Sequence, residues 1–219
     1  MRIFQLFYLS LATVLVVPAA IAQGVAGFGT CSPRIQKRPG AVGCFIITDQ
    51  PVGKFNARPV YWHISRFPTR KSATRARPAN GTVVEAYDHI WLMDVADAKW
   101  RAPGGKEVAR IGPLPVDTAT SYSALYMEAT MRPGMKSAIH RHSGPEMWYT
   151  MSGETCLETP NGATLGRAGG RPVIIPGDLP MELTATGHTL RRSLVLILHD
   201  SQKPPTAMES RWKPAGKCK

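Results

Sequence analysis

Glycine and proline are spread over most of the chain, and this distribution limits its fold more than any other feature. The 219 residues include 20 glycines and 19 prolines. Because proline removes a backbone donor and glycine weakens a helix, long helices are hard to place between them. The short apolar runs between these residues are typical of strands joined by turns. The pattern predicts an all-β fold, arranged as a sandwich or a small barrel.

The expected elements are short. Extended segments at 44–53 and 58–65 predict strands or an extended N-terminal arm. One short helix is predicted from Pro68 to Arg77, with proline at an early helical position and Pro78 ending it. Further strands are predicted in the segments 82–87, 90–95, 107–113, 121–131, 136–142, 146–160, 172–176, 181–187 and 191–200.

The N-terminus has the pattern of a secretory signal peptide. Arg2 precedes an apolar run at 6–17, and the small residues Ala20 and Ala22 form an A-x-A cleavage site. A membrane anchor is the alternative, but about 20 apolar residues are needed to span a bilayer. We therefore expect cleavage near Gln23, no integral membrane segment afterwards, and a periplasmic or secreted protein.

Composition favours one compact domain with additional arms. Hydrophobic residues make up 43% of the chain and charged residues only 19%. We expect a signal peptide at 1–22, an N-terminal arm with the short helix at 23–79, the main domain at 80–200 and an irregular C-terminal tail at 201–219.

The chain is strongly basic, with a formal charge of +12 that falls to +11 when Arg2 leaves with the signal peptide. Such a charge attracts anionic partners at long range. The cations are scattered, and the densest cluster lies between Arg66 and Arg77. Because no nucleic-acid-binding module accompanies them, a solvated basic surface is favoured over nucleic-acid binding.

Four cysteines, Cys31, Cys44, Cys156 and Cys218, predict two disulfides in an exported chain. Among the three possible connectivities we favour Cys31 with Cys44, because it closes a short local loop, and Cys156 with Cys218. Metal ligation by these cysteines is the weaker alternative, since no C-x-x-C spacing is present.

The stretch GMKSAIHRHSGPEMWYTMSGE, residues 134–154, carries the candidate site. Alternate side chains of a strand share a face, so His140 and His142 point the same way. Glu146 follows on the next predicted strand, where a carboxylate can return beside the two imidazoles. Two imidazoles and a carboxylate suit a divalent transition metal with open positions for a substrate. The alternative is an ordinary pair of surface histidines beside a turn.

These residues resemble the first motif of the cupin superfamily, G(X)5HXH(X)3-4E(X)6G. Gly134, His140, His142, Glu146 and Gly153 match every fixed position. The resemblance covers about residues 80–200. It implies a double-stranded β-helix, the cupin jelly-roll barrel, with the metal inside.

The second cupin motif, G(X)5PXG(X)2H(X)3N, is only partly matched. Gly170 and Pro176 stand at their positions, but Asp178 replaces the second glycine and Met181 replaces the third metal histidine. Ala185 replaces the final asparagine.

The resemblance therefore implies a four-ligand site in which Met181 stands at the fourth position. Soft sulfur suits copper, above all Cu(I), and is a poor ligand for Mn(II) or Zn(II). The alternative, which we favour, is that Met181 is an apolar filler and the metal is held by three ligands or weakly. Copper, iron and manganese all stay open, with copper favoured if Met181 ligates.

An apolar wall is predicted beside the ligands. By strand parity Trp148 faces inward with Glu146, whereas Met147 and Tyr149 face the other way. The wall residues are Met127, Met135, Met147, Trp148, Tyr149, Met151 and Leu183. Such a group describes a small-molecule pocket or an ordinary core equally well. The other histidines, His63, His89, His188 and His199, are not expected to be ligands.

Two functions follow from this reading. One is a metal-dependent enzyme, an oxygenase or isomerase, acting on a small molecule that is either anionic or neutral. The other is a non-catalytic cupin that binds a small ligand or senses metal. The sequence leaves the choice between enzyme and binding protein open, because one fold carries many functions. Dimerisation through the N-terminal strands is likewise left open.

Overall fold

The computed structural model describes residues 31–34, 37, 40–56 and 59–218. The predicted signal peptide lies outside these residues. In the part of the chain that the structure describes, no helix has the length and apolar character needed to cross a membrane.

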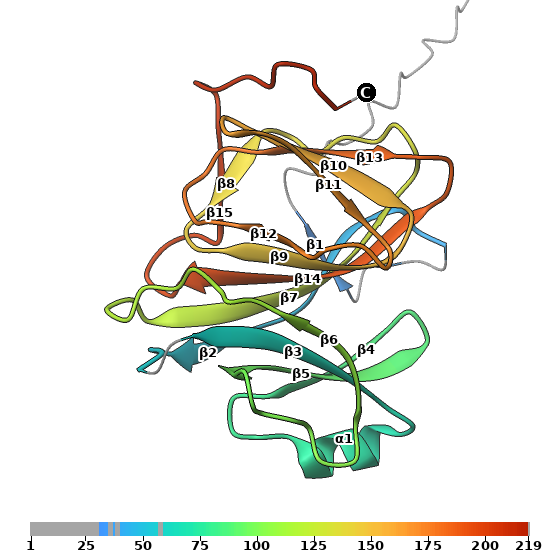
Figure 1. The fold of residues 1–219 in the computed structure, drawn as a ribbon, viewed down its shortest axis with the longest axis vertical. Helices are drawn as coiled ribbons and strands as arrows, with labels where there is room; N and C mark the ends of the chain where they lie inside the picture. The colour runs from blue at the N-terminus through green and yellow to red at the C-terminus, as the bar shows by residue number, and fades with distance from the viewer. Residues whose placement is uncertain (1–30, 35–36, 38–39, 57–58, 219) are drawn as a thin grey trace, which may run out of the picture.

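The described chain consists of strands and one short helix, as predicted (Figure 1). In chain order the elements are β1 (Ser32–Pro33), β2 (Gly43–Gly53), β3 (Val60–Phe67), α1 (Arg70–Ala76), β4 (Thr82–Ala86), β5 (His89–Asp97), β6 (Lys106–Ile111), β7 (Tyr122–Met131), β8 (His140–His142), β9 (Glu146–Ser152), β10 (Glu154–Thr159), β11 (Gly162–Arg167), β12 (Val173–Ile175), β13 (Glu182–Thr186), β14 (Arg191–Asp200) and β15 (Thr206–Met208).

The strands form three layers (Figure 1). A six-stranded sheet in the order β1-β2-β7-β14-β9-β12 lies in the middle. A four-stranded sheet, β4-β5-β3-β6, covers one face, and the other face is covered by the sheets β11-β10-β13 and β15-β8. The middle sheet and the sheets on this second face form the double-stranded β-helix. Among the described strands they are facing sheets and not one closed ring.

The middle sheet is buried on both faces, and its sequence shows why. All ten residues of β7 are buried, as expected for a strand covered on two sides. Tyr126 and Leu196 pack against the four-stranded sheet, whereas Met127 and Val195 face the second face with the candidate site. The alternation of the strands therefore divides the core into two apolar layers.

Strands from the segment predicted as an N-terminal arm are built into two sheets. β2 pairs with β7 in the middle sheet, and β3 lies between β5 and β6 in the four-stranded sheet. Trp62 and Ile64 of β3 are fully buried, and the ring of Trp62 lies 6.4 Å from that of Tyr126. Burial of such large side chains fixes these strands on the core. Dimerisation through them stays a prediction.

The helix is shorter than predicted because threonine, not proline, begins it. Thr69 is the N-cap residue, and its hydroxyl accepts a hydrogen bond from the Ser72 backbone nitrogen, 3.1 Å away. Pro68 therefore lies before the cap, and α1 runs only from Arg70 to Ala76.

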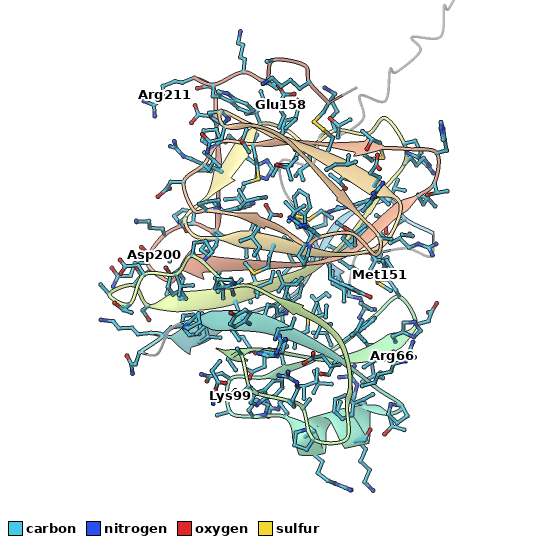
Figure 2. All side chains as sticks on the ribbon, viewed as in Figure 1. Arg66, Lys99, Met151, Glu158, Asp200 and Arg211 are labelled. Carbon is cyan, nitrogen blue, oxygen red and sulfur yellow. A yellow bond between two sulfur atoms is a disulfide. The ribbon has the colours of Figure 1, made fainter. Side chains whose placement is uncertain are left out.

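Both predicted disulfides are confirmed, Cys31 with Cys44 and Cys156 with Cys218. The second disulfide joins the end of the C-terminal tail to β10. Glu158, labelled in Figure 2, is buried beneath the tail, and its carboxylate accepts hydrogen bonds from the backbone nitrogens of Lys217 and Cys218. The tail is therefore fixed to the domain by covalent and polar contacts together.

Candidate metal centre

The two histidines and the glutamate of the first motif come together inside the protein. His140 and His142 lie at the two ends of the short strand β8, and Glu146 is the first residue of β9. All three side chains are buried, and one ligand atom from each lies within 4.8 Å of the others. The imidazole centroids are 4.9 Å apart. The prediction that these three groups converge therefore agrees with the geometry.

Glycine is required where β9 turns into β10, which the sequence predicted as one strand. Gly153 has a φ of +69°, and a Cβ there would lie 2.7 Å from the Cα of Arg191. A side chain is excluded by the backbone conformation and by this close approach. The closing glycine of the motif thus fixes the path of the strand that begins at Glu146.

Backbone carbonyls orient both imidazole rings. Nδ1 of His140 lies 2.7 Å from the carbonyl oxygen of Ala138, and Nδ1 of His142 lies 2.8 Å from that of Pro205. Because a carbonyl oxygen only accepts, Nδ1 carries the hydrogen in each ring. The lone pair on each Nε2 is then free for a metal ion, the usual arrangement for ligating histidines.

Glu146 offers one oxygen that has no hydrogen-bond donor. Its Oε1 accepts a hydrogen bond from Nε1 of Trp148 at 2.7 Å. Its Oε2 is buried and has no hydrogen-bond partner among the described residues. Nε2 of His142 lies 3.3 Å from this oxygen, near enough for an ion pair but not aligned as a hydrogen bond. A buried carboxylate oxygen without a donor is costly, and a cation would satisfy it.

Burial and mutual charge set the protonation of the three groups. Burial, with the neighbouring His142, lowers the pKa of His140, so this ring is neutral. Burial also lowers the pKa of His142, but the adjacent Glu146 carboxylate outweighs it and the pKa is raised overall. For Glu146, burial favours the neutral acid, yet His142 outweighs burial and holds the pKa below its usual value. The two opposite shifts favour the ion pair of His142 and Glu146 over the neutral pair, and a metal ion would displace the proton from Nε2 of His142.

Met181 lies opposite His140. The two residues form an antiparallel bridge, with Met181 donating to the His140 carbonyl at 2.8 Å and His140 donating back at 3.1 Å. Opposed residues share a face, so the Met181 side chain points to the same side as the imidazole. It is 1% exposed and packs in the apolar layer with Trp148 and Leu183. This packing favours the apolar-filler interpretation over ligation.

Aspartate at position 178, in place of the motif glycine, still allows the backbone conformation that the turn needs. Asp178, where the motif has glycine, has a φ of +59°, a left-handed conformation that aspartate tolerates better than most residues. Its backbone nitrogen donates to the carbonyl oxygen of His142 at 2.7 Å. The turn therefore still supports the strand that carries the histidines.

A cavity of about 300 Å³ adjoins the three ligands. Its walls are mainly apolar, and Met127, Trp148 and Leu183 belong to them as predicted. The other predicted wall residues, Met135, Met147, Tyr149 and Met151, do not line it, and for Met147 and Tyr149 this agrees with the direction that strand parity predicted. Met147 is on the opposite face of the middle sheet, and Tyr149 and Met151 pack there as well, because strand alternation turns odd positions of β9 away from the site.

Two parts of the site were not predicted. Arg191, the first residue of β14, lines the cavity and is buried. Its parity with Val195 and Ile197, which belong to the same apolar layer, would have placed it inside. Pro205 and Thr206 of the tail also line the cavity. No local sequence pattern indicates that they belong to the site, because Pro205 and Thr206 contact His142 from more than 60 positions away in the chain.

The middle sheet and the sheets on its second face, with the first motif between them, have the arrangement of a double-stranded β-helix, the fold that the resemblance to the cupin superfamily implies. The ligand cluster lies between the middle sheet and β8. No protein-family model matches the chain, and no curated protein matches it.

Solved structures are similar to parts of the chain. A double-stranded β-helix protein from Klebsiella pneumoniae is 19% identical with a TM-score of 0.35, covering 46% of this chain and 80% of its own. A cupin-like protein from Thermotoga maritima is 15% identical with a TM-score of 0.36, covering 40% and 65%. Oxalate oxidase in complex with glycolate is 21% identical with a TM-score of 0.33, covering 39% and 45%. The match thus spans less than half of the oxalate oxidase chain.

Proposed function

We propose that this protein binds one divalent transition metal ion through Nε2 of His140, Nε2 of His142 and Oε2 of Glu146. The observation that carries the proposal is the buried Glu146 oxygen, to which no described residue donates a hydrogen bond and which faces two imidazoles whose Nδ1 atoms are already engaged. These are the first-motif residues, and the donor set of two nitrogens and one oxygen suits iron, manganese or zinc as well as copper. Packing of Met181 in the apolar layer weakens the particular case for copper.

We further propose that the protein is a metal-dependent enzyme acting on a small organic molecule in the adjoining cavity. A metal with three protein ligands keeps open positions, where it polarises a bound oxygen atom or activates dioxygen. The protein's own residues hold the ligands in one orientation and surround the reacting molecule with apolar side chains. A cavity of about 300 Å³ is at the small end of the range for such sites.

Export to an oxidising compartment belongs to the same proposal. The four cysteines form two disulfides, and disulfides persist in secreted or periplasmic proteins. The second candidate is a non-catalytic protein that binds the small molecule or senses metal. The observation that favours it is methionine at position 181, which leaves the site one imidazole short of the cupin pattern.

The metal proposal is tested by elemental analysis after dialysis against Mn(II), Fe(II), Cu(II) and Zn(II) in separate samples. The wild-type protein should retain one ion per chain of at least one metal. Glu146→Gln keeps the shape and can still accept from Trp148, but it removes the charge, so the metal should be lost. His188→Ala, which changes an exposed histidine, is the matched control and should retain it. Wild-type protein without metal, or equal retention by Glu146→Gln, would overturn the proposal.

A further inference from the structure

Arg191 is a buried cation whose hydrogen-bonding capacity is largely unused. Its side chain is 3% exposed, and neither Nε nor Nη2 has a hydrogen-bond partner among the described residues. The remaining contact, from Nη1 to the sulfur of Met131, is long at 3.7 Å and uses a weak acceptor. Leaving a charged group buried with unmade hydrogen bonds is expensive, so folding alone gives no reason to keep it there.

The guanidinium group lies beside the metal centre. Its Cζ atom is 5.2 Å from the centre of the Trp148 ring, and Nε1 of the same indole donates to Glu146. One aromatic side chain therefore contacts both the cation and a proposed metal ligand. Burial lowers the pKa of Arg191 to about 10, with smaller opposing effects of Tyr87 and Glu146, so the group stays protonated at neutral pH.

Apart from the three proposed ligands, Ser137 and Thr206, the walls of the cavity beside Arg191 are apolar. Arg191 is the only arginine or lysine among the lining residues that the structure describes. Leu125, Met127, Val195 and Ile197 form much of the wall. Planar guanidinium groups bind carboxylates through two parallel hydrogen bonds, and such bonds are stronger away from water. The cavity thus offers one fixed cation for an anion and apolar walls for a short hydrocarbon body.

We propose that the small molecule bound in this cavity is a carboxylate, and that its carboxylate group pairs with the unpartnered nitrogens of Arg191. This inference names the substrate class for the site and rests on the proposed function for what happens to the molecule afterwards. Arg191 binds and positions, while the opposite end of the molecule faces His140, His142 and Glu146. The carboxylate supplies the acceptors that the buried guanidinium lacks.

The test measures carboxylate binding without metal. Metal is removed with a neutral chelator such as phenanthroline, because a carboxylate chelator would compete. Calorimetric titration with butyrate and with butyramide, an uncharged molecule of the same shape, should show binding of butyrate only. Arg191→Met keeps much of the side-chain volume and should weaken butyrate binding at least tenfold, as expected for loss of charge-assisted hydrogen bonds.

The neighbouring exposed Arg192 provides the matched control, since Arg192→Met removes the same charge from the surface. It should bind butyrate as the wild type does. The melting temperature of Arg191→Met should equal or exceed that of the wild type, because an unsatisfied buried charge is removed. A residue with a merely structural role would instead lower the melting temperature.

The inference is overturned if Arg191→Met and wild-type protein bind butyrate equally, if butyramide binds as well as butyrate, or if the wild type binds no butyrate at millimolar concentrations. The dialysis experiment tests the metal proposal independently of butyrate binding. Butyrate binding through Arg191 in a protein that retains no metal after dialysis would refute the proposed metal centre and support the carboxylate site. Metal retention in a protein that does not bind butyrate would support the metal centre and refute the carboxylate site.

Discussion

Nδ1 of His142 donates its hydrogen to the carbonyl oxygen of Pro205, 2.8 Å away, and this contact joins the proposed metal centre to the C-terminal tail. The hydroxyl of Thr206 lies 3.1 Å from the same nitrogen. Strand β15 pairs with β8 directly beside it, and Arg141 forms an ion pair with Glu209 at 3.0 Å. The tail therefore helps to hold the ligand strand and is more than a covering for the domain.

Removal of residues 203–219 should weaken metal binding. The loss of the acceptor for His142 frees the ring to rotate and to change tautomer, and loss of such a supporting contact typically costs about 10- to 100-fold in affinity. Competition titration with a metal indicator measures the change. The double variant Cys156→Ser/Cys218→Ser keeps Pro205 and β15 but removes the covalent link, and it should bind metal within a few-fold of the wild type. An equal loss in both proteins would assign the effect to the disulfide.

Met181→His should raise the affinity for Mn(II) or Zn(II) about tenfold or more. Position 181 lies opposite His140 and shares its face, so a third imidazole can reach the ligands. Met181→Leu is the control, since a volume-conserving apolar change costs little packing energy. If methionine is only a filler, this variant keeps its copper affinity; a marked loss of copper affinity would show that the sulfur ligates. Unchanged Mn(II) and Zn(II) affinity in Met181→His would mean that position 181 faces away.

The two disulfides should contribute unequally to the free energy of unfolding. Cys156 and Cys218 close a loop of 62 residues, whereas Cys31 and Cys44 close one of 13. Loop-closure entropy gives about 4 kcal/mol for the longer loop and about 3 kcal/mol for the shorter. Urea unfolding of the two double Cys→Ser variants measures both values. A larger loss for Cys31→Ser/Cys44→Ser would contradict this order.

Asp94 should make stability depend on pH in the acidic range. Burial raises the pKa of this carboxyl group from 3.8 to about 6, against a smaller lowering effect of a backbone hydrogen bond from Val95. Because the folded state holds the proton more tightly, the stabilising contribution is complete below pH 3.8 and is lost as pH rises through 6.

As pH rises from below 3.8 to above 6, the wild-type free energy of unfolding should therefore fall by up to about 3 kcal/mol relative to that of Asp94→Asn. Urea unfolding of both proteins at several pH values gives this difference. Asp88→Asn, at an exposed position of the turn before β5, is the control and should follow the wild-type profile. Parallel profiles for Asp94→Asn and wild type would show that the carboxyl group titrates normally in the folded protein.

Strand alternation and ligand spacing were sufficient to predict that the three candidate ligands lie together. The pair His140 and His142, with Glu146 on the following strand, converges because a period of two fixes side-chain direction whatever the surrounding topology. The same rule placed Trp148 toward the site and Met147 away from it. The favoured cysteine pairing followed from the short loop between Cys31 and Cys44, which left Cys156 for Cys218.

Contacts between distant segments were beyond the sequence. Trp62 is apolar enough for any core, and nothing local shows that β3 joins a separate sheet packed on Tyr126. Pro205 acts through a backbone carbonyl, which has no signature in the residue type. Arg191 was not predicted in the site, although its parity points inward, because a cation at the start of an apolar strand usually faces water. That Nε and Nη2 have no hydrogen-bond partner among the described residues is known only from the structure.

Anomalous diffraction from crystals soaked in Mn(II) or Zn(II) would locate the bound ion in the proposed metal centre. We predict one strong peak per chain, about 2.0–2.3 Å from Nε2 of His140, Nε2 of His142 and Oε2 of Glu146, with the Nδ1 contacts to Ala138 and Pro205 kept. A peak elsewhere in the protein, or none at these three atoms while Glu146 Oε2 is paired with His142 alone, would contradict this prediction.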